Sequence, residues 1–343
     1  MRAASYVPMG EAPASSDFRP AAVLDRPILV SRRRAWWRWR PAWRFQAPAW
    51  TSSFPFHLAL LAATVLTTLI VGAQMAANYA AGRPAFDLDL SWSFLLGIGH
   101  NPFLLLSGLP FSGTLLGILF AHELGHYLTA RAYGLRVSYP YFIPAPTLIG
   151  TLGAFIRIRE PIHTRRMLFD VAVAGPLAGF VLAIPALTAA ILRSRVGTVA
   201  PVPDMIIPGH PLALTLLAHW TRPGVPVSHL VLTPAGCAAW VGLFATALNL
   251  LPISQLDGGH LLYAVFERRH RAVARVLWIT LFPLGYFCWT GWFFWAVLIA
   301  FIRIKHPPVA FPTDGLGRAR LVLAVLAVAI LALCFMPTPF SIR

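Results

Sequence analysis

The sequence Ala121-His122-Glu123-Leu124-Gly125-His126 lies inside a long apolar run, in which Glu123 is the only formally charged side chain between residues 90 and 130. An ionised carboxylate is costly in hydrocarbon, so an ionisable group at that depth indicates a functional site. Residues four apart share one face of a helix, so His122 and His126 can present both imidazoles to one metal ion. Glu123 then lies where it can take a proton from a water on that metal. The stretch predicts a metal centre within a membrane segment.

The composition indicates a polytopic membrane protein. Of the 343 residues, 57% are hydrophobic and 12% are charged, which is about half the charged fraction of an average globular domain. The net charge of +16 comes from basic residues between the apolar runs. Basic residues placed between apolar segments usually set the orientation of a membrane protein, so we expect no nucleic-acid partner. The three cysteines lie in separate apolar runs, and we expect them to pack as small apolar residues.

The apolar runs predict an all-α membrane protein of about six or seven transmembrane helices, because a run of about 20 residues spans the hydrocarbon core. We expect a short strand or hairpin element near residues 141–159, where Pro and Gly interrupt the pattern. Residues 92–110 are interrupted in the same way and predict an interfacial or re-entrant segment, and residues 211–220 are too short to span. Residues 276–302 form one span or a hairpin broken near Pro283 and Gly285. The other predicted spans are residues 54–82, 111–130, 171–192, 229–252 and 321–336.

Four regions follow from this pattern. Residues 1–50 form an Arg/Trp-rich cytoplasmic tail, which we expect to be disordered and to contact anionic lipid headgroups through residues 32–40. Residues 51–110 hold the first transmembrane helix and the re-entrant segment. Residues 111–260 form the membrane core with the metal centre, and residues 261–343 hold the C-terminal transmembrane helices.

The arginine distribution predicts the orientation. With the N-terminus inside, the inner segments hold 19 arginines and the outer loops hold four. The C-terminal end of the His helix then faces the cytoplasm, and His126 lies about 8 Å from that end at 1.5 Å per residue. Asp257 follows the inner end of its own span, so both motifs reach the same leaflet. We therefore expect an integral membrane protein with a cytoplasmic N-terminus.

The second motif spans residues 249–259 and contains two candidate site residues, Asn249 and Asp257. Two imidazoles and one carboxylate are usual ligands of a catalytic zinc, so Asp257 is the natural third ligand. We expect Gly258 and Gly259 to let the backbone approach the metal. The Asn249 amide binds a developing oxyanion or forms an interhelical hydrogen bond, and the sequence leaves both roles open. His260 is a further candidate for support of the ligands.

Two ordered motifs, His122-Glu123-Leu124-Gly125-His126 and Asn249-Leu250-Leu251-Pro252 with Leu256-Asp257-Gly258-Gly259, resemble the site-2 protease family of intramembrane zinc metalloproteases. Residues 141–159 and 174–180 resemble the branch that contains bacterial members and their chloroplast relatives. The resemblance implies one zinc per chain, held by His122, His126 and Asp257, with Glu123 as the catalytic base and Asn249 as a substrate contact. The family's PDZ domain is missing, because the intervals 131–167 and 193–228 are too short to hold one.

We therefore expect hydrolysis of a peptide bond in a membrane-embedded protein substrate, near the cytoplasmic leaflet. Helical substrates hide their carbonyls in hydrogen bonds, so local unwinding must precede attack. The edge at residues 150–158 can hold the unwound chain by strand addition, although a plain connecting hairpin fits as well. A membrane metal transporter and a non-proteolytic relative that binds transmembrane helices are the alternatives. The oligomeric state is left open.

Overall fold

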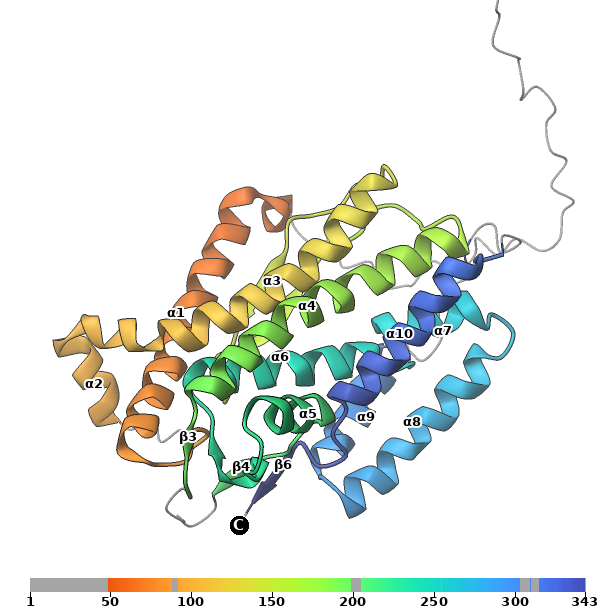
Figure 1. The fold of residues 1–343 in the computed structure, drawn as a ribbon. Helices are drawn as coiled ribbons and strands as arrows, with labels where there is room; N and C mark the ends of the chain where they lie inside the picture. Colours follow the sequence, from red (N-terminus) through yellow and green to blue (C-terminus); the bar gives the residue numbers. More distant parts are fainter. Residues whose placement is uncertain are drawn as a thin grey trace, which may run out of the picture. The chain divides into compact units, whose positions relative to one another are not determined.

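The computed structural model describes residues 49–87, 92–198, 205–253, 255–302, 309 and 315–342 (Figure 1). The predicted tail at residues 1–50, including its Arg/Trp cluster, therefore lies almost wholly outside the described residues. The described part is mostly helical, with three two-stranded sheets. The predicted helical class is confirmed, and the strand pairs are short additions to it.

Three helical stretches in the described residues are long and apolar enough to cross a membrane. The first is α1 (Phe54–Ala81), which ends as predicted at Gly82 in the left-handed conformation (φ 68°). The second joins a 3-10 turn (Pro102–Gly108) to α3 (Leu109–Ala132), the helix that carries the His pair. The third is α4 (Arg165–Arg193). Their cores match the predicted spans at residues 54–82, 111–130 and 171–192.

The segment before α3 contains a short helix, α2 (Trp92–His100), followed by the 3-10 turn. Asn101 separates the two, and its side chain accepts a hydrogen bond from the Phe103 backbone N–H at 3.2 Å. Nine residues rise only about 14 Å, so α2 cannot cross a bilayer. This agrees with the predicted interrupted segment.

The strand element predicted near residues 141–159 is confirmed as an antiparallel pair, β1 (Tyr141–Pro144) and β2 (Thr151–Phe155). It lies along α1, where the Thr67 hydroxyl donates a 2.6 Å hydrogen bond to the Gly150 carbonyl. Gly150 has φ of +76°, and a Cβ there would lie 2.8 Å from the Thr67 carbonyl oxygen. The turn therefore needs glycine for its conformation and for its close approach to α1.

The core around the His helix is built by α3, α4 and α6 (Pro234–Leu250), and α3 and α4 run side by side (Figure 1). The predicted span 229–252 is wrong at its start. The Thr233 side chain accepts a hydrogen bond from Gly236 and begins the helix, so α6 has 17 residues. The residues before it form a 3-10 turn (Val227–His229) and a strand, β5 (Leu230–Val231).

After α6 the chain forms α7 (Asp257–Val265), α8 (His270–Phe287), α9 (Gly291–Ile302) and α10 (Arg318–Cys334). The hairpin alternative for residues 276–302 is correct, but the break comes a few residues after the predicted position near Pro283 and Gly285, because both residues lie inside α8. Gly285 lies on the face that packs against Phe293 of α9, and the turn follows at residues 288–290. α6, α8, α9 and α10 have only 12 to 18 residues each, so the count of six or seven spans stays a prediction.

Two small sheets lie at the opposite end of α4 from its first turn. β3 (Arg195–Val196) pairs with β5, and β4 (Ile206–Pro208) pairs with β6 (Phe340–Ile342), near the short helix α5 (Leu212–Thr221). The sequence pattern predicts neither sheet. Each strand has two or three residues and pairs with a distant segment, so no local period marks it.

Candidate metal centre

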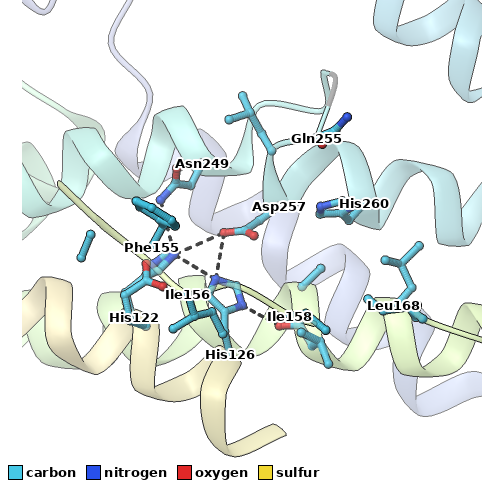
Figure 2. A pocket seen from close by; sticks show the side chains of 16 residues that line it. His122, His126, Phe155, Ile156, Ile158, Leu168, Asn249, Gln255, Asp257 and His260 are labelled. Atoms are coloured by element: carbon cyan, nitrogen blue, oxygen red, sulfur yellow. Dashed lines mark hydrogen bonds and ion pairs between the residues drawn. The ribbon is translucent and has the colours of Figure 1, made fainter. Parts of the chain in front are cut away.

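Helix α3 brings His122, Glu123 and His126 to its buried face near its C-terminal end. Their relative exposures are 6%, 6% and 8%, respectively. The two Nε2 atoms lie 3.1 Å apart, as one turn of helix allows. Figure 2 shows both imidazoles pointing toward Asp257.

Asp257 is the first residue of α7, and its Oδ2 atom completes a triangle with the imidazoles. The Oδ2 atom lies 3.2 Å from His122 Nε2 and 3.3 Å from His126 Nε2. A tetrahedral zinc with bonds of about 2.0–2.1 Å separates its ligand atoms by about 3.3–3.4 Å. The three edges of 3.1 to 3.3 Å therefore fit one zinc ion, and within the described residues this is the one cluster of three such side chains.

A backbone carbonyl orients one of the imidazoles. His126 donates from Nδ1 to the carbonyl of Val171 on α4, at 2.7 Å. Since Nδ1 carries the proton in this bond, Nε2 presents its lone pair toward Asp257. A carbonyl has no residue-type signature, so the sequence offers no signal for this contact.

Small residues on α4 make room for both imidazoles. A Cβ on Gly175 would overlap the His126 ring, and a Cβ on Gly179 would lie 3.3 Å from the His122 Cβ. On α3, a Cβ on Gly125 would meet the Ala174 carbonyl. The small residues at 174–179 therefore allow close packing of α3 against α4 and shape the space for the imidazoles.

The corner between α6 and α7 is closely packed. Asp257 begins a helix, and Gly258 packs against backbone: a Cβ there would lie 2.7 Å from the Leu251 carbonyl carbon and overlap the Leu250 carbonyl. This packing gives Gly258 a role in the crossing of the chain, and the expectation that Gly258 and Gly259 let backbone approach the metal stays a prediction. Glycine is needed there for the crossing of two chain segments, which sets the position of Asp257.

The Asn249 side chain, from the last turn of α6, also reaches the site. Its amide nitrogen lies 3.3 Å from His122 Nε2 (Figure 2). The contact joins α6 to α3, as the predicted interhelical hydrogen bond would, and it also turns the amide toward the candidate metal site, so both predicted roles stay open. His260, one turn after Asp257, lines the same cavity.

The site opens into a cavity of about 260 Å³. One wall of the cavity is polar. The opposite wall is apolar and is formed by α4 and by residues 151–159, which we call the β2 segment because they comprise β2 and the four residues after it. Glu123 and Ile156, which lies just after β2, both line this cavity. The cavity-lining residues are His122, Glu123, His126, Ala154, Phe155, Ile156, Ile158, Ile162, Leu168, Val171, Ala172, Asn249, Gln255, Leu256, Asp257 and His260.

Comparison with known proteins places this cavity in a family. Residues 110–285, just over half of the chain, match the model of peptidase family M50. The probable zinc metalloprotease EGY2 of Arabidopsis thaliana, a chloroplastic protein, is 30% identical over 272 residues, which are 75% of this chain and 46% of that protein. The probable zinc metalloproteases EGY1 of rice (Oryza sativa subsp. japonica) and Arabidopsis thaliana are each 34% identical over 169 residues. These cover 47% of this chain and 29% and 30% of those proteins, respectively.

The chain spans less than half the length of these curated relatives. The matched region holds α3, α4, α6 and α7, which together build the His122–His126–Asp257 triangle. The predicted resemblance to chloroplast proteins is confirmed. With three helices long and apolar enough to cross a bilayer, the chain is an integral membrane protein, and it belongs to peptidase family M50.

Proposed function

We propose that this chain is a zinc-dependent endopeptidase that hydrolyses a peptide bond in a membrane-embedded protein. The observation that carries the proposal is the His122–His126–Asp257 triangle, with edges of zinc-ligand length, beside the buried carboxylate of Glu123. The metalloprotease names of the relatives support zinc as the ion. A bound zinc ion polarises a substrate carbonyl and lowers the pKa of water.

In this proposal each side chain has a separate task. His122, His126 and Asp257 hold one zinc ion. Glu123 accepts the proton of the attacking water and returns it to the departing amine. Asn249 donates from its amide to the carbonyl oxygen as negative charge develops there.

The free edge of the β2 segment is the proposed binding place for an unwound substrate. Ser138 donates from its N–H to the Arg157 carbonyl at 3.0 Å, and Arg159 donates to the Arg136 carbonyl at 2.9 Å. Residues 157 and 159 thus turn their backbone groups toward the partner segment. Because a strand alternates, Ile156 and Ile158 turn theirs to the opposite edge.

That opposite edge borders the cavity. Ile156 and Ile158 both line it, and Glu123 lines the same cavity. Within the described residues, the sheet has two strands, so β2 has one edge without a strand partner. An extended peptide on this edge would form backbone hydrogen bonds and pass its carbonyls beside Glu123.

We also propose that the site lies near the cytoplasmic leaflet of a bacterial inner membrane, with the N-terminus inside. The support is the 19-to-four arginine distribution. Cysteines introduced at Arg157 and Arg269 should react with impermeant reagents only from the cytoplasmic side. Labelling only from outside would reverse the orientation and leave the chemistry intact.

Two substitutions test the activity directly. Glu123→Gln should retain zinc and abolish cleavage of a reporter transmembrane helix, because Gln has nearly the same shape but cannot accept the proton. General acid–base steps contribute about 10²–10⁴-fold. Asp257→Ala should lower zinc content and cleavage together, and His260→Ala should have a milder effect.

The measurements are zinc content per purified protein and the rate of reporter cleavage. Near wild-type cleavage by Glu123→Gln would exclude Glu123 as the base. Full zinc content and full cleavage in Asp257→Ala would exclude that carboxylate from the site. Zinc transport into vesicles without any cleavage would favour the transporter alternative.

A further inference from the structure

The first two turns of α4 contact both parts of the chain that carry the metal ligands. Arg165, the first residue of α4, donates from Nε to the Ala264 carbonyl at 2.8 Å and reaches the Val265 carbonyl at 3.4 Å. These are the last two residues of α7, whose carbonyls have no partner within the helix. A guanidinium at a helix C-terminus also interacts favourably with the helix dipole. Arg165 therefore fixes one end of the nine-residue helix whose other end is Asp257.

Asp170 makes a second set of contacts five residues later. Arg320 of α10 binds its carboxylate through two nitrogens, at 2.7 and 2.6 Å, and donates to the Leu316 carbonyl at 3.3 Å. The hydroxyl of Tyr133, the residue just after α3, donates to the same carboxylate. The next residue, Val171, holds His126 Nδ1. Asp170 thus ties the ends of α3 and α10 to the carbonyl that orients a metal ligand.

We propose that Arg165 and Arg320 are positioning residues of the metal centre. Arg165 acts through α7 on Asp257, and Arg320 acts through Asp170 and Val171 on His126. Arg165 lies in the first two turns of α4 and Arg320 binds Asp170 in the same two turns, so this segment sets the distance between the two ligands. The inference rests on the proposed zinc site and adds to it residues that touch neither metal nor substrate.

Burial distinguishes these contacts from ordinary surface pairs. The side chains of Arg165, Asp170 and Arg320 are 18%, 20% and 28% exposed, whereas Arg136, which pairs with Glu160, is 78% exposed. Sheltered bidentate hydrogen bonds to guanidinium restrict geometry more than exposed pairs do. Asp170 also connects α4 to the end of α3, through Tyr133, and to α10, through Arg320. Without these bonds the turn of α4 that contains Val171 can shift relative to both helices.

A matched control lies at the other end of α4. Arg222 donates to the carbonyls of Leu192 and Ser194, so it binds the C-terminal carbonyls of a helix just as Arg165 does. Those carbonyls lie roughly 20 residues along α4 from Val171, which is about 30 Å of helix. Loss of Arg222 should therefore affect stability without affecting the ligands.

The test measures the zinc dissociation constant of the purified full chain by competition with a chelator, alongside the melting temperature. Arg165→Gln should weaken zinc binding by about 10–100-fold, the usual effect of removing support from a metal ligand. Arg320→Gln should weaken it by up to about five- to tenfold, because Arg320 acts through the one hydrogen bond between Val171 and His126. Arg165→Lys and Arg320→Lys keep the charge but not the planar fork, and they should give intermediate affinities. Arg222→Gln should bind zinc like the wild type, even where its melting temperature falls as far.

Wild-type zinc affinity in Arg165→Gln and Arg320→Gln would overturn the proposal, as would an equal loss in Arg222→Gln. Where the Gln variants do not fold, the Lys variants decide: weakened binding supports the proposal, and unchanged binding contradicts it. A wild-type chain that binds no zinc would instead refute the proposed function. The two failures are therefore distinguishable.

Discussion

Helix α3 and the corner between α6 and α7 supply the proposed zinc ligands in different ways. α3 presents His122 and His126 from one helical turn, so their 3.1 Å separation follows from local geometry. The corner presents Asp257 from a separate short helix. The position of Asp257 depends on the close packing of Gly258 against the Leu250 carbonyl and on Arg165, which binds the far end of α7.

This difference teaches which substitutions a metal centre tolerates. A ligand pair on one helix stays paired as long as the helix forms. A ligand on a packed corner moves whenever the packing moves, even with every ligand unchanged. Substitutions in the packing around Asp257 should therefore act on that ligand from a distance. The His pair should respond to direct contact with the imidazoles and to loss of the Asp170–Arg320 support behind the Val171 carbonyl.

Among the substitutions that compare these two regions, Asn249→Ala should have the largest effect. It tests whether the corner contributes to catalysis beyond supplying Asp257. Loss of one oxyanion-binding donor typically lowers kcat by about 10²–10³-fold. Zinc affinity should stay unchanged, because Asn249 is not one of the three ligands. Gln255→Ala, on the same cavity, is the control. A fall in zinc affinity with normal kcat would instead assign Asn249 to ligand support or helix packing.

Gly258→Ala should break the corner while leaving α3 intact. The added methyl group would overlap backbone atoms of Leu250 and Leu251, which cannot rotate away. Overpacking costs about 1–3 kcal/mol, so zinc affinity should fall about 10–100-fold. Gly113→Ala on α3 is the control, since the methyl group added there would meet no atom within 4 Å. Competition with a chelator gives the zinc affinity of both variants. Equal affinities would show that the close packing of Gly258 against the Leu250 carbonyl does not set the position of Asp257.

Gly175→Ala should disturb the His pair by direct contact. The methyl group would overlap the His126 ring, but a side chain can rotate at the cost of its hydrogen bond to Val171. That bond contributes about 1 kcal/mol, so zinc affinity should fall about five- to tenfold. Gly117→Ala, whose nearest neighbour would be Leu182 Cδ2 at 3.8 Å, is the control. An effect larger than that of Gly258→Ala would reverse the proposed difference between the two regions.

The smallest effect is expected from Thr67→Val, which removes the bond from α1 to the Gly150 carbonyl. The hairpin should loosen by about 1 kcal/mol. KM for a reporter helix should rise a few-fold, with kcat and zinc affinity unchanged. Thr188→Val, which loses only a bond within α4, is the control. An unchanged KM would indicate that the hairpin is a plain connection.

Much of the fold follows from the sequence where the signal is local. α1 and α3 begin and end within two residues of the predicted spans, because apolar length, proline and glycine mark them. The predicted span at α6 is too long, because an apolar run does not reveal that Thr233 begins the helix. The predicted turn between α8 and α9 is too early, since packing of Gly285 against α9 keeps the helix intact through Pro283.

The side chains of the candidate site can be predicted from the sequence, but their support cannot. Residue type and spacing single out His122, His126 and Asp257, and the structure brings them together. The Val171 carbonyl and the Asp170–Arg320 pair give no such signal. A carbonyl is common to every residue, and a pair separated by 150 positions has no spacing to read.

That 150-residue separation has a consequence for the newly made chain. Ribosomes add about 5–20 residues per second, so Arg320 is synthesised roughly 8–30 s after Asp170. In the last part of that interval, after residue 265 has been added, α3, α4, α6 and α7 have all been synthesised, but Val171 lacks its anchor. If Arg320 positions the metal centre, a nascent chain holds its zinc weakly, and the enzyme matures only when α10 docks. Timing of synthesis would then keep an unfinished protease inactive beside other nascent membrane proteins.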